Sequence, residues 1–116
     1  MIIPLDVVPT NLEEAVKVLK DNLTMEDIEE IRRPTSVSTQ CHFSGCMAIR
    51  NEWSLWDETT ILVRWFQGRY GLTHADDISG IILECLWNDI RGEPRRDKIL
   101  AEQFKKHWEK QGKRHE

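Results

Sequence analysis

Apolar residues recur at helical spacing through most of the chain, and the clearest case lies between Thr73 and Gly92. The spacing of three or four positions places the apolar side chains of this segment on one face of a helix. Gly92 suits a left-handed C-cap, and Pro94 prevents simple continuation. We predict a central buried helix at 74–91, which begins with a capping box of Thr73 and Asp76. Its apolar face consists of Ile78, Ile81, Ile82, Cys85, Leu86 and Ile90.

The same period predicts shorter helices before and after this segment, at 11–22, 25–33, 41–52, 58–69 and 95–111. No segment alternates with the period of two that is typical of a β-strand. We therefore expect an all-α fold, a compact bundle of five or six helices around the central helix. The residues expected to face the core of the shorter helices include Met25, Ile28, Ile31, Ile61, Leu62, Trp65, Phe66, Ile99, Leu100, Phe104 and Trp108.

Side chains that can cap helices stand before several of these segments. Capping boxes are expected where a threonine precedes an acidic residue by three positions. Thr10 with Glu13 and Thr24 with Asp27 have this spacing. Asp57 is expected to cap the helix that follows it.

The chain of 116 residues has the size of one domain. We expect a single helical domain over 1–116, with 1–9 as an extended lead-in and 112–116 as a frayed tail. No apolar run reaches the roughly 18 residues of a membrane helix. The first residues also lack the basic start and long apolar run of a signal peptide. A cytoplasmic protein without a membrane partner is the default expectation.

The three cysteines, Cys41, Cys46 and Cys85, show no paired spacing. An odd number without such spacing argues against a disulfide framework. Free cysteine is often buried, so we expect the three to serve as small core residues.

The net charge of −4 is distributed unevenly along the chain. Residues 1–58 hold 11 acidic and 5 basic side chains, whereas residues 59–116 hold 9 acidic and 11 basic ones. An acidic half disfavours nucleic acid as the main partner and suits a basic protein surface. In the last helix, acidic side chains are interspersed with the basic ones, which is typical of a solvated face. The densest acidic patch consists of Glu26, Asp27, Glu29 and Glu30.

A cluster of polar and aromatic residues stands out in the middle of the chain. His42 and Arg50 are eight positions apart and would share one face of a helix. If that face meets the start of the central helix, Arg50 would pair with Asp76 or Asp77 and hold two helices in register. Alternatively, Arg50 would hold an anion, tryptophan rings would stack on a ligand, and His42 or His74 would move a proton. The candidate ligand-binding residues are His42, Arg50, Asn51, Trp53, Trp56, His74, Asp76 and Asp77.

Motifs with established chemistry do not occur in the sequence. HExxH, CxxC and a glycine-rich phosphate loop are all missing. His42, His74 and Asp76 would supply three metal ligands at most, without the spacing of a known site. We therefore expect no metal and no cofactor, and an enzyme is not favoured.

Two segments, CHFSGCMAIRNEWSLW and GLTHADDISGIIL, resemble a family of short bacterial proteins known only as a domain of unknown function. Its members are similar in the patterns H-F-G-x-G-x-x-I-R-N-x-W-x-L-W and G-x-x-H-P-D-D-M-S-x-x-I-L. The resemblance covers roughly Ile3 to Trp108, with Cys46 in place of a glycine and Ala75 in place of a proline. It implies an all-helical unit and brings no activity with it. The motif positions are occupied by His42, Phe43, Ile49, Arg50, Asn51, Trp53, Leu55, Trp56, His74, Asp76, Asp77, Ser79 and Gly80.

These observations favour a small acidic cytoplasmic binding protein that docks on a basic surface of a partner protein and blocks it, as immunity proteins and inhibitors do. The predicted contact surface is the acidic patch of Glu26, Asp27, Glu29 and Glu30. The alternative is a ligand-binding or catalytic domain with a pocket at His42, Arg50, Trp53, His74 and Asp77. Binding of nucleic acid through the last helix is the weakest hypothesis, and the sequence sets no oligomeric state.

Overall fold

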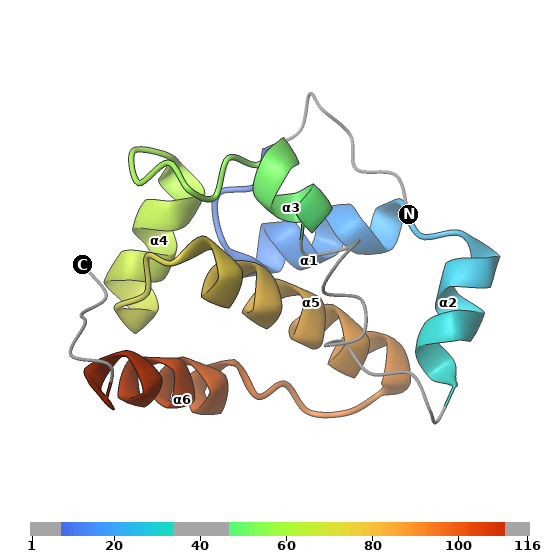
Figure 1. Cartoon of the computed structure of the whole chain (residues 1–116). Coiled ribbons are helices and arrows are strands. Elements are labelled where there is room, and N and C mark those ends of the chain that lie inside the picture. Colours follow the sequence, from blue (N-terminus) through green and yellow to red (C-terminus); the bar gives the residue numbers. More distant parts are fainter. Residues whose placement is uncertain (1–7, 34–46, 111–116) are drawn as a thin grey trace.

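The computed structural model describes residues 8–33 and 47–110, and these residues form an all-helical protein (Figure 1). Within the two ranges there are six helices and no strand, which confirms the predicted fold class. The helices are α1 (Leu12–Asp21), α2 (Met25–Arg32), α3 (Met47–Glu52), α4 (Ile61–Tyr70), α5 (Ala75–Arg91) and α6 (Asp97–Lys110). The predicted lead-in lies mostly outside the described residues, as do the first half of the predicted helix 41–52 and the tail.

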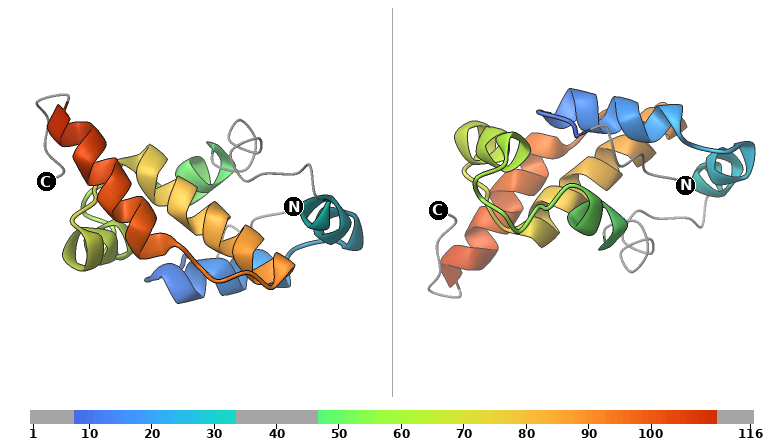
Figure 2. Two further views of the ribbon diagram at one scale, coloured as in Figure 1. Left: turned by 90° about the horizontal axis from the view of Figure 1, so that it is seen from below. Right: turned by 90° about the horizontal axis from the view of Figure 1, so that it is seen from above.

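Helix α5 runs through the middle of the molecule, as the sequence predicts (Figure 1). It contacts α1, α2, α3 and α6. Figure 2 shows that α1 and α6 lie on different sides of α5 and that α2 stands at one end of the molecule. Ten of the 17 residues of α5 are buried. Fully burying one of its isoleucine or leucine side chains stabilises the fold by about 1.5–3 kcal/mol.

The core continues from α5 into the helices around it. α1 contributes one apolar face at helical spacing, and α4 contributes three side chains that are completely buried. The turn between α3 and α4 adds Trp53 and Leu55. The core residues outside α5 include Leu12, Ala15, Val16, Leu19, Ile49, Leu62, Val63, Phe66 and Leu72.

Two glycines end helices in the left-handed conformation. Gly71 follows α4 and Gly92 follows α5, and each has a φ of 72°. The backbone N–H of Gly92 donates to the carbonyls of Asn88 and Asp89. Glycine adopts this conformation without the steric cost of a Cβ atom. The predicted C-cap at Gly92 is therefore confirmed.

The predicted capping boxes give mixed results. Thr24 and Asp27 form the expected box at the start of α2. Thr10 does not cap α1, because the side chain of Asn11 accepts from the backbone N–H of Glu14 at 2.9 Å. The prediction for Thr10 was wrong by one position, since the asparagine carbonyl is an equally good N-cap acceptor and lies next to the first turn.

The starts of α4 and α5 also differ from the prediction. Thr60, not Asp57, caps α4, because Asp57 instead accepts from the backbone N–H and hydroxyl of Thr59, at 2.9 and 2.6 Å. His74 stands at the N-cap of α5 without a side-chain cap. His74 and not Thr73 therefore occupies the N-cap position, and the carboxylate of Asp76 pairs with Arg50 of α3.

Three apolar residues predicted to face the core are exposed. Met25, Ile61 and Ile99 have exposed fractions of 74%, 66% and 54%. All three lie in the first turn of their helices. Periodicity identifies the apolar face of a helix, but it does not determine how far a neighbouring helix extends along that face. In α6 the buried residue is Ala101, and Phe104 is half-buried.

Candidate functional site

Three helices meet at the start of α5, where the sequence predicts a polar and aromatic cluster. Arg50 of α3 pairs with Asp76 of α5, as predicted. The next residue, Asp77, is 8% exposed and accepts from the indole Nε1 of Trp108 at 2.8 Å. The ring of His74 lies 4.6 Å from the ring of Trp108, with 33° between their planes. These side chains therefore join α3, α5 and α6.

The other predicted members of the cluster are placed differently. Trp53 is 2% exposed and belongs to the core, and its Nε1 has no hydrogen-bond partner within the described ranges. Trp56 is 60% exposed, so the two tryptophans do not present a common surface. Asn51 is also exposed. His42 lies outside the described residues.

Trp108 is part of this cluster although the sequence placed it only in an apolar stripe. A signal for its role was available, because a buried carboxylate such as Asp77 requires hydrogen-bond donors. Trp108 offers one indole N–H. The donor lies 31 positions further along the chain, so the partner itself could not be identified from spacing.

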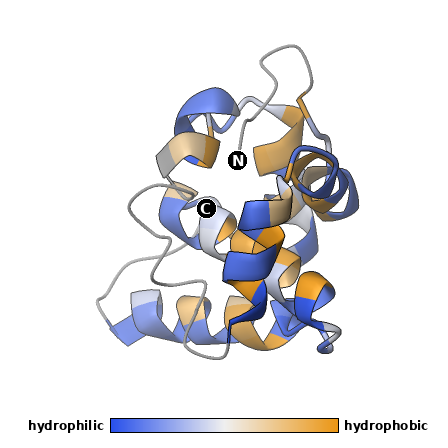
Figure 3. Ribbon diagram, turned by 90° about the vertical axis from the view of Figure 1, so that its right-hand side faces the viewer, coloured by the Kyte–Doolittle hydropathy of each residue, from blue (hydrophilic) through white to orange (hydrophobic). Residues whose placement is uncertain are grey.

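The acidic patch lies on α2, at the end of the molecule that faces the viewer in Figure 3. Glu26, Glu29 and Glu30 are exposed. The exposed side chain of Met25 lies on the same outward side of the helix, since positions 25, 26, 29 and 30 are neighbours at 3.6 residues per turn. Hydrophilic and hydrophobic residues accordingly alternate along the ribbon of α2 (Figure 3).

Asp27, the fourth predicted member of the patch, has a role within α2 itself. Its carboxylate accepts from the backbone N–H of Thr24 at 3.0 Å, and its side chain is half-buried. This backbone hydrogen bond lowers the pKa of Asp27 below its ordinary value. Glu30 pairs with Arg33 at the end of the helix. The patch that faces solvent is therefore narrower than predicted.

The C-terminal end of α2 is held by Arg91 of α5. Its Nε donates to the carbonyl of Ile31 and its Nη2 donates to the carbonyl of Arg33, each at 2.7 Å. The last carbonyls of a helix lack partners within the helix, so these bonds satisfy two such groups. Ile31 also provides the buried side chain of α2.

A network of four charged side chains was not predicted. Asp89 accepts from Nε and Nη2 of Arg95, at 2.9 and 2.6 Å, and pairs with Lys20 at 2.7 Å. Arg95 also pairs with Glu13 of α1. The hydrogen bonds from Arg95, followed by those from Lys20, lower the pKa of Asp89 to about 2. Glu13 and Arg95 are 82 positions apart, so no local pattern indicates their contact.

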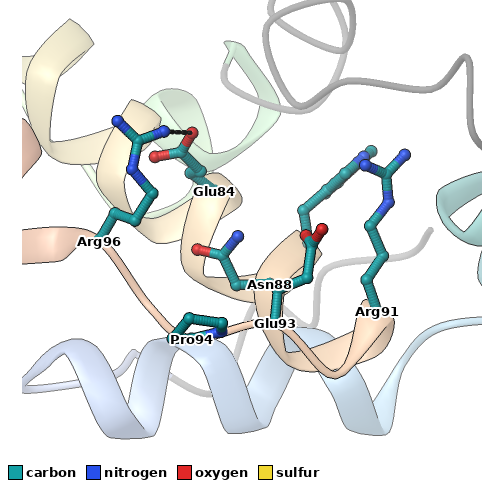
Figure 4. Close-up of a pocket in the computed structure, with 7 residues that line it drawn as sticks. Glu84, Asn88, Arg91, Glu93, Pro94 and Arg96 are labelled. Atoms are coloured by element: carbon teal, nitrogen blue, oxygen red, sulfur yellow. Dashed lines mark ion pairs between the residues drawn. The ribbon is translucent and has the colours of Figure 1, made fainter.

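A cavity of about 340 Å³ beside the C-terminal half of α5 was also not predicted. Glu84 and Asn88 project from α5, and Pro94 and Arg96 face them from the connection to α6 (Figure 4). The spacing of four between Glu84 and Asn88 is a signal that two polar side chains share one face. The apolar face predicted for this part of α5 consists of Cys85, Leu86 and Ile90 and includes neither of them.

Cys85 is completely buried in α5. Burial in apolar surroundings raises the pKa of its thiol to about 12. A thiol with so high a pKa is protonated and unreactive at neutral pH. Cys85 is therefore the small core residue that the sequence predicts, while Cys41 and Cys46 lie outside the described residues.

Two further properties concern the described parts of the chain only. Residues 8–33 and 47–110 contain no group of three or more His, Cys, Asp or Glu side chains that could hold a metal ion. None of the six helices in these ranges combines the length and apolar character needed to cross a membrane.

Comparison with known proteins gives one family match, which covers most of the described structure. Among curated proteins and among solved structures, none matches the chain. The model of one domain family matches residues 8–90, which include α1 to α4 and nearly all of α5. The match ends before α6, so the contacts of Trp108 and Arg95 involve residues outside it. Because it covers more than half of the 116 residues, the chain belongs to the family described as domain of unknown function DUF6794.

Proposed function

We propose that this protein binds a partner protein through the outward face of α2 and covers a basic surface of that partner. The observation that carries the proposal is the composition of this face. It combines a methionine that is 74% exposed with the exposed carboxylates of Glu26, Glu29 and Glu30. Protein interfaces typically have an apolar centre, in which methionine is enriched, and a polar rim.

The two kinds of side chain would contribute differently to binding. Burying the side chain of Met25 against a partner would stabilise a complex by about 1.5–3 kcal/mol. The carboxylates would attract a basic surface and raise the association rate, with an effect that decreases as salt is added. α2 contains four acidic side chains and one arginine, so its own field is negative.

A partner whose basic surface is functional would be blocked by this contact, which is how an inhibitor or immunity protein acts. We further propose that the interaction takes place in the cytoplasm, in keeping with the free thiol of Cys85.

The contacts at the start of α5 favour a role in joining helices over a ligand pocket. Arg50 pairs with Asp76, Asp77 accepts from Trp108, and Trp53 is inside the core. These groups therefore already have structural roles in the described protein.

Site-specific photocrosslinking in the native host tests which face meets the partner. A photoreactive phenylalanine derivative is incorporated in place of Met25, and in a control protein in place of Ile99. Both positions are exposed and apolar, but Ile99 lies on α6. We expect one protein to be crosslinked from position 25 and not from position 99. Equal crosslinking from both positions, or none from position 25, would contradict the proposal.

A charge-reversal pair then tests the role of the carboxylates. The double variant Glu26→Lys/Glu29→Lys is compared with Glu58→Lys/Glu109→Lys, which has the same net charge but changes exposed residues far along the chain from α2. We expect the association rate with the crosslinked partner to decrease roughly tenfold or more in the first variant only. Equal decreases in both variants would show that net charge matters and the face does not.

A further inference from the structure

The outward face of α4 carries apolar and basic side chains. Ile61 is 66% exposed, and Arg64 and Arg69 are exposed as well. Ile61, Arg64 and Gly68 follow one another at spacings of three and four, so they share the side of the helix that is opposite its buried side chains. The ten residues of α4 include two arginines and no acidic residue. This face is therefore the counterpart of the outward face of α2, which combines an exposed methionine with carboxylates.

The packing of the described residues does not explain why position 68 is a glycine. Gly68 lies inside α4, where glycine is less favourable than alanine. Its φ is not in the left-handed region, and a Cβ atom at this position would meet none of the described atoms within 4 Å. Glycine also permits the close approach of another molecule to a helix. The open space at Gly68 can therefore accept an apolar side chain that belongs to a partner.

The outward face of α2 matches this face of α4 when the two helices lie antiparallel. Met25 is 74% exposed and stands four positions before the exposed Glu29, while Arg64 stands four positions before Gly68. Four positions correspond to a rise of about 6 Å in either helix. In an antiparallel pair, Met25 therefore lies over Gly68 in the same register that places Glu29 opposite Arg64. The two helices also have similar lengths, eight residues in α2 and ten in α4.

The charges beyond these two contacts select the antiparallel direction. α2 carries Glu26 in its first turn, and two exposed arginines, of which Arg33 is the second, stand at its end. The exposed Asp57 and Glu58 precede α4, and Arg69 lies in its last turn. An antiparallel arrangement places the acidic start of α2 beside Arg69 and its basic end beside the two carboxylates before α4. A parallel arrangement would bring like charges together at both ends.

The two faces belong to one chain but lie at opposite ends of the molecule, as Figure 1 and both views of Figure 2 show. They can therefore meet only between copies. We infer that α2 of one copy docks antiparallel on α4 of a second copy, with Met25 over Gly68 and Glu29 opposite Arg64. The contact can close as a twofold dimer, in which it occurs twice, or repeat along a series of copies. This inference rests on the proposed docking function of α2 and names a second copy of the chain as its partner.

Sedimentation velocity of the purified full chain tests the association. Helices about 12 and 15 Å long bury less than the roughly 800 Å² per partner of a standard interface, so we expect a dissociation constant of about 10–100 µM. The average mass should therefore rise above that of one chain between about 5 and 500 µM. A protein that stays monomeric up to about 1 mM would overturn this inference, but it would leave the docking of α2 on another protein intact.

An exchange of charges at the central contact identifies the two faces. Glu29→Arg and Arg64→Glu each place like charges opposite one another, so each variant alone should associate roughly tenfold or more weakly than wild type. An equimolar mixture should associate as wild type does, because each α2 then meets an α4 of opposite charge in the other variant. A mixture that associates no better than its components would contradict the pairing. Normal association of Glu29→Arg would refute the role of α2 in this contact and in the proposed function together.

Two further variants separate association from folding and from net charge. Gly68→Gln fills the space for Met25 with a better helix former, so association should weaken roughly tenfold or more while the melting temperature stays equal or rises. Glu109→Arg changes the net charge as Glu29→Arg does, but at an exposed position on α6, and it should associate normally. Normal association of Gly68→Gln, or an equal loss in Glu109→Arg, would contradict the inferred contact.

Discussion

The substitution Asp89→Asn tests the charged network that joins α1, α5 and the connection to α6. The asparagine has nearly the same shape as the aspartate but no charge. It therefore removes the attraction to Arg95 and Lys20 without leaving a cavity. We expect the variant to fold and to be less stable at neutral pH.

The size of the effect follows from the pKa of Asp89, which falls from 3.8 to about 2 in the folded protein. Each unit of difference between the folded and unfolded pKa corresponds to about 1.36 kcal/mol. The folded state therefore favours the charged carboxylate by about 2 kcal/mol. The side chain of Asp89 is 17% exposed and that of Arg95 is 23% exposed, which keeps most of this attraction from being screened. Lys20 is 40% exposed, so solvent weakens its share, and we expect a loss of about 1–2 kcal/mol.

The pH dependence has a definite sign. Because the folded pKa is lowered, the stabilisation is complete above about pH 5 and is lost as pH falls towards 2. About half of it should remain at pH 3. Urea unfolding of wild type and variant between pH 7 and pH 2 measures the difference, in which the contributions of the other carboxylates largely cancel. The two proteins should approach equal stability at the acidic end.

The matched control is Asp21→Asn, which removes an exposed carboxylate that pairs with Lys17 at 3.1 Å. Exposed pairs of this kind contribute about 0.5 kcal/mol or less. If Asp89→Asn were no more destabilising than Asp21→Asn, or if its effect were the same at pH 3 as at pH 7, our reasoning about the network would be refuted.

Three other predictions follow from single contacts. Arg91→Ala should lower the free energy of unfolding in urea by about 1–3 kcal/mol, because two carbonyls at the end of α2 lose their donor, and Arg91→Lys should lose less. Tyr70 is the single tyrosine of the chain, and burial together with its hydrogen bond to Asp97 raises its pKa, so the absorbance of native protein should show phenolate only well above pH 10. In a variant whose other two cysteines are serine, Cys85 should not react with a thiol reagent at pH 8 until the protein is unfolded; reaction at the rate of a free thiol would contradict its burial.

The parts of the fold that depend on local interactions could be predicted from the sequence. The left-handed turn at Gly92 needs only a glycine, and the apolar face of α5 needs only periodicity. Helix starts were less certain, because neighbouring side chains compete for the same backbone N–H groups. Asn11 replaced Thr10 as the cap of α1, and Thr60 replaced Asp57 as the cap of α4.

The candidate site was predicted where one helix face carries a charge opposite an acidic helix start, as for Arg50 and Asp76. The bond between Asp77 and Trp108 could not be predicted, since it depends on where α6 packs against α5. The cavity depends in the same way on the path of the connection between these helices. Each of these features is a property of the tertiary arrangement, which no short window of sequence contains.

The attachment of α2 has a consequence for how the protein moves. Among the described residues, α2 buries the side chain of Ile31 and accepts two hydrogen bonds from Arg91 at its end, whereas α5 is surrounded by four other helices. The free energy needed to detach α2 is therefore a small part of the free energy of global unfolding. Its amide hydrogens should exchange with deuterated solvent through local opening, long before those of α5. The helix that we propose as the docking surface is thus also a part of the described structure that can adapt its position to a partner at a small energetic cost.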